Sequence, residues 1–162
     1  MTQVPEILKA SQSKGLKLAT AESCTGGMVA AALTEIAGSS DVFERGFVTY
    51  SNTAKQEMLG VSVDTLEQFG AVSEPVAQEM AEGALKNSRA NLAVSITGIA
   101  GPGPSEHKPE GRVCFGLAVG GETQVETVEF GALGRENVRM AARDHALGML
   151  LNAVIPANAG TS

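Results

Sequence analysis

Apolar residues recur along this chain at two spacings, one typical of helices and the other of strands. The helical spacing predicts six helices, over residues 4–15, 28–36, 51–60 and 62–70, from Ser73 to beyond Leu85, and over residues 135–154. Short apolar runs predict five strands, over residues 16–21, 47–50, 92–97, 112–119 and 124–130. Serines stand where three of the helices begin, and serine is a favoured N-cap.

The order of these elements predicts the fold class. Strands alternate with helices as far as residue 97, and alternation implies parallel strands joined by right-handed crossovers. Gly120-Gly121 separates the last two strands and is typical of a hairpin, which implies one antiparallel strand. We therefore expect a single α/β domain over residues 1–155, a three-layer α/β/α sandwich with a mixed, mostly parallel five-stranded sheet. Residues 156–162 are expected to form a flexible tail.

Composition narrows the class of protein. The chain has 162 residues, 43% hydrophobic and 19% charged, so it can bury a core, and one Tyr, five Phe and no Trp make that core mainly aliphatic. A net charge of −6 without a basic run argues against nucleic-acid binding. No segment approaches the roughly 20 apolar residues of a membrane helix. Two cysteines are too few for a disulfide framework, so we expect a cytoplasmic chain. From the charge and the lack of a long apolar segment we expect neither nucleic-acid nor membrane partners.

Ligands of open α/β sheets bind at the carboxyl ends of the strands. Three polar or glycine-rich segments leave those ends here, at residues 22–27, 50–55 and 98–111. In the first, Ser23 stands on a sharp turn before a helix, where backbone N–H groups can stabilise an oxyanion or a phosphate. Ser23 or Thr25 can equally be the N-cap of that helix. Cys24 is a rival nucleophile or a small buried apolar residue.

A serine nucleophile needs a base. The two histidines, His107 and His145, stand in the glycine–proline loop and in the last helix, so a Ser-His-Asp triad is disfavoured. Lys55 falls in the first turn of a helix that starts at a strand end, and burial there would lower its pKa toward that of a base. Tyr50 ends the preceding strand and can relay a proton. The structural alternatives are that Lys55 is a solvated surface lysine and that Tyr50 is an aromatic residue at the boundary of the core.

The third segment, residues 98–111, is a loop of roughly 14 residues, a length usually found in functional or disordered loops. It follows a buried strand, as phosphate-binding loops do, but has neither the Walker nor the GxGxxG pattern. Lys108 and Arg112 flank its end and could neutralise a phosphate, although solvation is the usual state of such residues. No metal-ligand spacing appears.

Four blocks of the sequence together resemble the CinA C-terminal family. They occur in the family's order and are TAESCTGG at 20–27, VTYSNTAK at 48–55, GAVSE at 70–74 and ITGIAGP at 96–102. The resemblance implies nicotinamide-nucleotide amidase activity by a serine–lysine mechanism, without metal or cofactor, and a three-layer fold. It makes Ser23 the nucleophile, with Tyr50 and Lys55 assisting. The expected substrate-binding residues belong to the same blocks and are Thr25, Gly26, Gly27, Ser51, Asn52, Gly98, Ile99, Ala100 and Gly101.

The resemblance leaves alternatives open. The chain begins some 15 residues before the first predicted strand and so resembles the stand-alone amidases, without a larger N-terminal domain. Pro104 and Glu110 depart from the family loop, which puts substrate affinity in question. A non-catalytic nucleotide-binding module would keep Lys55 charged and in solvent, whereas a base would be desolvated. An interaction protein of competence or DNA damage, and a homo-oligomer packed through Ala- and Gly-rich helices, are further alternatives.

Overall fold

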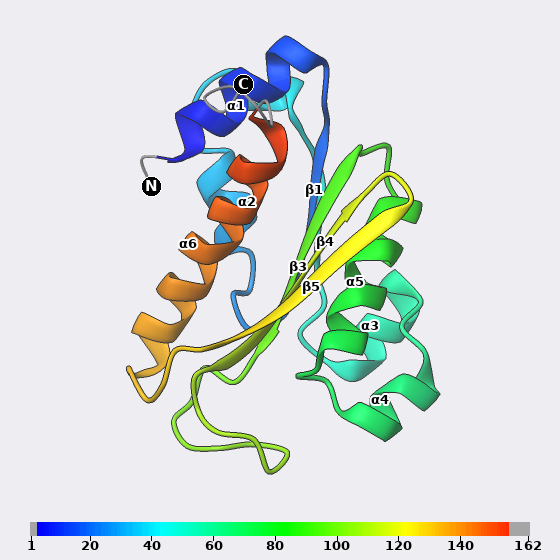
Figure 1. Cartoon of the computed structure of the whole chain (residues 1–162), viewed down its shortest axis with the longest axis vertical. Helices are drawn as coiled ribbons and strands as arrows, with labels where there is room; N and C mark the ends of the chain where they lie inside the picture. Colours follow the sequence, from blue (N-terminus) through cyan, green and yellow to red (C-terminus); the bar gives the residue numbers. More distant parts are fainter. Residues whose placement is uncertain (1–2, 156–162) are drawn as a thin grey trace, which may run out of the picture.

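The computed structural model describes residues 3–155, which form six α-helices, one 3-10 turn and five strands (Figure 1). The predicted tail over residues 156–162 lies outside the described residues. The elements, in chain order, are α1 (Gln3–Lys14), β1 (Leu18–Glu22), α2 (Met28–Leu33), η1 (Ser39–Asp41), β2 (Phe43–Val48), α3 (Asn52–Leu59), α4 (Val63–Phe69), α5 (Glu74–Lys86), β3 (Leu92–Gly98), β4 (Arg112–Val119), β5 (Glu122–Glu129) and α6 (Arg135–Val154).

The five strands form one mixed sheet in the order β2-β1-β3-β4-β5. β1 pairs in parallel with β2 and β3, whereas β3–β4 and β4–β5 are antiparallel. The expectation of a mostly parallel sheet is therefore wrong, because half of the four pairings are antiparallel. The reason is the hairpin at Gly120-Gly121: β4 runs opposite to the other strands, and as an inner strand it forms antiparallel pairs on both sides.

Helices cover both faces of the sheet, which gives three layers (Figure 1). On one face α1, α2 and α6 pack over a large aliphatic cluster that includes Leu18, Val94 and Leu147. On the other face α3, α4 and α5 enclose a second cluster around Met80. Phe47 and Phe115 are the aromatic residues among the buried hydrophobic side chains of residues 3–155, so the core is mainly aliphatic as predicted. Within the same range no helix is both long and apolar enough to cross a membrane.

Two predicted boundaries are wrong for identifiable reasons. β2 starts at Phe43, four residues before the predicted residue 47. It is an edge strand whose early residues are partly or fully exposed, so they lack the apolar pattern that marks a strand. Helix α2 ends at Leu33 rather than at residue 36. Just after Leu33, the Thr34 hydroxyl donates to the carbonyls of Ala30 and Ala31 and so competes with the helical hydrogen bonds.

The register of the sheet brings three strand ends together. Glu22, the last residue of β1, lies beside Val48 of β2 and Ile96 of β3. The three strands are parallel, so the segments that follow them emerge at the same edge. This edge is where the candidate site lies.

Candidate active site

A cleft of ≈ 320 Å³ opens at the carboxyl ends of β1, β2 and β3. Its walls are the turn after β1, the start of α3, the link between α4 and α5, and the loop between β3 and β4. The residues that line it are Ser23, Cys24, Tyr50, Asn52, Lys55, Ala71, Val72, Arg135 and the run from Thr97 to Glu106. The predicted Ser23, Tyr50 and Lys55 therefore share one cleft.

Ser23 and Lys55 are in hydrogen-bond contact. Lys55 Nζ lies 3.0 Å from Ser23 Oγ and donates to the carbonyl oxygens of Thr49 and Tyr50 at 3.0 and 3.5 Å. A neutral amine has two N–H groups and one lone pair. Two donations to carbonyls leave that lone pair for the Ser23 hydroxyl proton, which is the geometry of a nucleophile and its base.

Burial favours the neutral form of this lysine. The Lys55 side chain is 1% exposed, and no carboxylate pairs with it among residues 3–155. Desolvation lowers the pKa of Lys55 below its ordinary value, against weaker opposing effects of Cys24 and Glu106. Lys55 is thus a desolvated amine in contact with a hydroxyl rather than a solvated surface lysine.

Tyr50 contributes differently from its backbone and from its side chain. Its carbonyl faces Lys55 Nζ, but the residue is 59% exposed and its hydroxyl accepts a hydrogen bond from Arg135 Nη2 at 2.5 Å. Within residues 3–155 the hydroxyl makes no hydrogen bond to Ser23 or Lys55. A proton relay through Tyr50 therefore stays a prediction.

The rival nucleophile Cys24 is unsuited to attack. Its side chain is 4% exposed and belongs to the aliphatic cluster beneath α2 and α6. Burial raises the pKa of the Cys24 thiol to about 12, so the thiol keeps its proton at neutral pH.

A buried carboxylate holds the turn that carries Ser23. Glu22 is fully buried, and its carboxylate accepts hydrogen bonds from the Thr25 hydroxyl at 2.6 Å and from the N–H groups of Gly27, Val29 and Ala30 at 3.2, 3.0 and 2.9 Å. These are the unpaired N–H groups at the start of a helix, where a negative charge is favourable. Glu22 therefore takes the place of a side-chain N-cap for α2.

Two of the three N–H groups expected to stabilise an oxyanion are engaged within the turn. Gly27 N–H donates to Glu22 and Gly26 N–H to the Ser23 carbonyl, whereas Thr25 N–H makes no hydrogen bond among residues 3–155. Thr25 is fully buried, and none of Thr25, Gly26 and Gly27 lines the cleft. The two glycines shape the turn: φ is +59° at Gly26 and +109° at Gly27, a conformation that glycine adopts without strain.

Arg139 holds the same turn from the other side. Its Nε donates to the Cys24 carbonyl at 3.0 Å and its Nη2 to the Thr25 carbonyl at 3.4 Å. The approach is close, since a Cβ at Gly26 would lie 3.2 Å from Arg139 Nη2. Glu22 thus binds N–H groups of the turn while Arg139 binds its carbonyls, and Ser23 is fixed between them.

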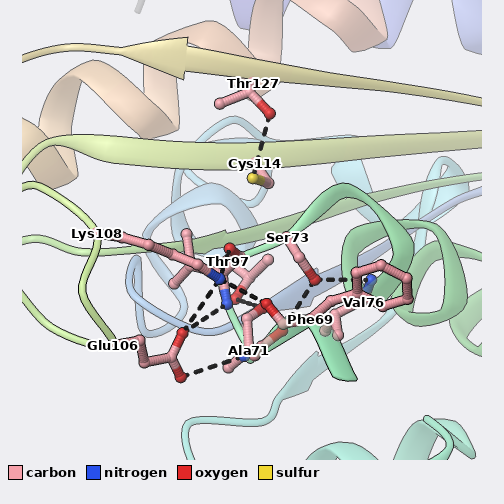
Figure 2. Close-up of polar contacts among 11 residues, drawn as sticks. Phe69, Ala71, Ser73, Val76, Thr97, Glu106, Lys108, Cys114 and Thr127 are labelled. Atoms are coloured by element: carbon pink, nitrogen blue, oxygen red, sulfur yellow. Dashed lines mark hydrogen bonds and ion pairs between the residues drawn. The ribbon is translucent and has the colours of Figure 1, made fainter. Parts of the chain in front are cut away.

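The long loop is attached to the rest of the molecule by a pair of charged residues. Figure 2 shows Glu106 and Lys108 pointing toward the link between α4 and α5. Lys108 Nζ donates to the carbonyls of Phe69 and Val72, both at 2.6 Å, and lies 3.5 Å from the Glu106 carboxylate. Glu106 accepts from the N–H groups of Ala71 and Val72 at 3.2 and 3.3 Å. The loop is therefore an ordered wall of the cleft.

Several charges considered from the sequence are engaged away from the cleft interior. Lys108 is bonded as described, and Arg112 pairs with Glu129 at 2.7 Å, so neither is free for a phosphate. Glu110 accepts from Gly103 N–H at 2.8 Å within the loop. Neither His107 nor His145 lines the cleft. Among residues 3–155, no three His, Cys, Asp or Glu side chains cluster as metal ligands would.

The remaining predicted ligand residues divide into two groups. Asn52 and the run Gly98, Ile99, Ala100 and Gly101 line the cleft. Ser51 does not line it: its hydroxyl accepts from Ala54 N–H at 3.0 Å and caps α3. This is the capping role that the sequence also allowed.

Sequence reasoning missed three charged residues, Glu22, Arg135 and Arg139. Glu22 was part of a recognised block, but its side chain acts as a cap from six residues before the first residue of the helix, a spacing that no standard N-cap pattern covers. Arg135 and Arg139 are four residues apart at the start of α6, so they share one helix face. That spacing is the signal that could have found them.

Comparison with known proteins identifies the family of this chain. The family model of the CinA C-terminal domain matches residues 2–154. This chain belongs to that family. It is 55% identical to the nicotinamide-nucleotide amidohydrolase PncC of Escherichia coli strain K12, over 91% of this chain and 88% of that protein. The PncC of Enterobacter agglomerans is 53% identical over 93% and 92% of the two chains.

A solved structure shows the same fold. The crystal structure of the competence/damage inducible protein CihA from Agrobacterium tumefaciens superposes with a TM-score of 0.90. It is 50% identical, and the match covers 93% of this chain and 94% of that one. The α/β fold with a five-stranded mixed sheet is therefore that of solved members of the CinA family.

Proposed function

We propose that this chain is a nicotinamide-nucleotide amidohydrolase that converts nicotinamide mononucleotide and water to nicotinic acid mononucleotide and ammonia. The observation that carries the proposal is the 3.0 Å contact between Ser23 Oγ and the buried Lys55 Nζ at the base of the cleft. The PncC relatives, matched over almost their whole length, support the substrate class.

In the first step Lys55 Nζ takes the Ser23 hydroxyl proton as Oγ bonds to the amide carbon of the substrate. The N–H group that follows a nucleophile on such a turn is the usual first donor to the oxyanion. Cys24 N–H occupies this position and makes no hydrogen bond to another residue in the range 3–155. The tetrahedral intermediate then collapses, the C–N bond breaks, and the leaving nitrogen takes the proton from Lys55 as ammonia departs.

In the second step water hydrolyses the acyl-enzyme. Lys55, neutral again, takes a proton from the attacking water, whose oxygen bonds to the acyl carbon. The Ser23–acyl bond breaks, Oγ recovers its proton, and the mononucleotide acid leaves. Asn52 and residues 98–101, which line the cleft, are the proposed contacts of the substrate.

The direct test is ammonia release from nicotinamide mononucleotide by the purified chain. We expect one ammonia for each nicotinic acid mononucleotide formed, measured by a coupled ammonia assay and by chromatography of the product. A folded enzyme that releases no ammonia at millimolar substrate would contradict the proposal.

Lys55 predicts the pH dependence of the reaction. The base must be neutral in the free enzyme, so kcat/KM should rise with pH as Lys55 loses its proton and should level off above its pKa. Because burial lowers that pKa below its ordinary value of 10.5, the plateau should be reached at a correspondingly lower pH. The measurement is kcat/KM between about pH 6 and pH 10. A kcat/KM that falls over this range, or that still rises tenfold per pH unit near pH 10, would contradict the role of Lys55 as a base with a lowered pKa.

The non-catalytic binding module is less well supported. A lysine that contacts a phosphate stays charged and faces solvent, whereas Lys55 is 1% exposed and contacts a hydroxyl.

We place the reaction in the cytoplasm, since both cysteines are free thiols, as is usual in reducing compartments.

A further inference from the structure

The tip of the long loop between β3 and β4 has a strained backbone. Ser105 and Lys108 exchange two backbone hydrogen bonds, at 3.0 and 2.8 Å, and so close a two-residue turn. The two central residues have positive φ, +55° at Glu106 and +63° at His107. Turns of this kind usually place glycine or asparagine there. Glu106 and His107 each carry a Cβ that disfavours the conformation, so other contacts must hold the turn.

Those contacts come from the two charged side chains of the turn, and Figure 2 shows both. Lys108 Nζ donates to the carbonyls of Phe69 and Val72, while the Glu106 carboxylate accepts from the N–H groups of Ala71 and Val72. Two side chains thus bond four backbone groups of the link between α4 and α5. We call Glu106, Lys108 and the backbone of residues 69–72 the clasp.

The link fits the clasp closely. A Cβ at Gly70 would lie 2.8 Å from Glu106 Oε1 and 2.9 Å from Lys108 Nζ, so the two charged groups reach the backbone only because residue 70 has no side chain. The N–H groups of Ala71 and Val72 donate to Glu106 and to no other group within residues 3–155. Their protection from solvent therefore reports whether the clasp is closed.

The clasp joins two walls of the catalytic cleft. Ala71 and Val72 line the cleft from the link, and residues 98–106 line it from the loop. At the base of the loop the Thr97 hydroxyl donates to the Ala71 carbonyl at 2.9 Å. Beyond that base, the hydrogen bonds between loop and link in the described part of the chain are those of the clasp. Opening of the clasp would free one wall from the other.

We propose that Glu106 and Lys108 are positioning residues that keep the cleft in its binding-competent form. The inference rests on the proposed amidase function and gives a role in it to two side chains that hold neither Ser23 nor Lys55. When the clasp is open in a fraction of the molecules, the apparent dissociation constant rises by the inverse of the closed fraction. Bound substrate restores the closed form, so turnover at saturation is kept.

The test compares Glu106→Ala and Lys108→Met with wild type on nicotinamide mononucleotide. Each should raise KM by about tenfold and keep kcat within about threefold. The double variant should have a KM within about threefold of the more affected single variant, because both side chains act through one clasp. Glu106→Gln keeps an acceptor oxygen and should recover part of the loss. Glu129→Gln is the matched control: it breaks the pair with Arg112, lies outside the cleft and should change neither constant.

Hydrogen exchange tests the clasp independently of catalysis. In Glu106→Ala and Lys108→Met the N–H groups of Ala71 and Val72 should exchange about tenfold faster than in wild type, while those of β3 keep their rates. Unchanged exchange at Ala71 and Val72 would overturn the proposal. So would a fall in kcat with unchanged KM, which would mean that the variants only reduce the amount of folded enzyme. A wild type that releases no ammonia contradicts the amidase function alone, and the exchange rates then decide the clasp.

Discussion

Replacement of Ser23 by Ala should abolish ammonia release while leaving the fold intact. The substitution removes the nucleophilic hydroxyl, whose hydrogen-bond partner is Lys55 Nζ, and changes no other group. The fold should therefore be retained. We expect kcat to fall by about 10³-fold or more.

Lys55→Met should lower kcat by roughly 10²- to 10⁴-fold, because the base is lost. Methionine fills much of the same buried space without an amine to desolvate, so its thermal midpoint should be no lower than that of wild type.

Cys24→Ala is the matched control for Ser23→Ala. It alters the adjacent side chain of the same turn, whose buried thiol is protonated. Its kcat should stay within about threefold of wild type, since backbone N–H of residue 24 is retained. Activity kept by Ser23→Ala but lost by Cys24→Ala would reverse the assignment of the nucleophile. Ammonia release under saturating substrate and the far-ultraviolet circular dichroism of each variant are the measurements.

Replacement of Glu22 by Ala should have the largest effect on stability among the residues of the site. Four donors, the Thr25 hydroxyl and the N–H groups of Gly27, Val29 and Ala30, would lose their acceptor inside the protein. We expect a loss of roughly 3–5 kcal/mol in the free energy of unfolding. Glu22→Gln keeps one acceptor oxygen but turns an amide N–H toward donors, so it should cost about 1–3 kcal/mol. Urea unfolding followed by circular dichroism gives both values.

Activity of Glu22→Gln separates positioning from mere stability. Under conditions where the variant is fully folded, kcat should fall while KM changes little, because Ser23 is displaced relative to Lys55 rather than the substrate from its site. Glu57→Gln serves as the control, since Glu57 is exposed on α3, and should change stability by no more than about 0.5 kcal/mol. A Glu22→Gln variant as stable and as fast as wild type would show that the buried carboxylate is dispensable.

The parts of the fold that could be predicted from sequence are those with a local cause. The spacing of apolar residues in α6, the serine caps of α3, α4 and α5, and the glycine pair before β5 all act within a few residues. The proportion of parallel strand pairs in the sheet could not be predicted from such local patterns. It depends on where β4 is inserted in the sheet, beside β3 rather than at the edge, and this placement is a property of the whole sheet.

The same distinction applies to the site. Ser23 and Lys55 were found because each follows a strand, and parallel strand ends meet at one edge. The contact of Arg139 with the Cys24 carbonyl joins residues 115 positions apart, and Arg135 reaches Tyr50 from 85 positions away. Such contacts arise from the packing of α6 against the sheet. Likewise, Lys108 appeared available to a phosphate until the structure showed its bonds to the link between α4 and α5.

The carboxylate of Glu22 also gives the site a direction. The start of a helix is a natural place for a phosphate, but at α2 the protein's own side chain already occupies it. A nucleotide bound as proposed, with its amide at Ser23, has its phosphate away from the start of α2.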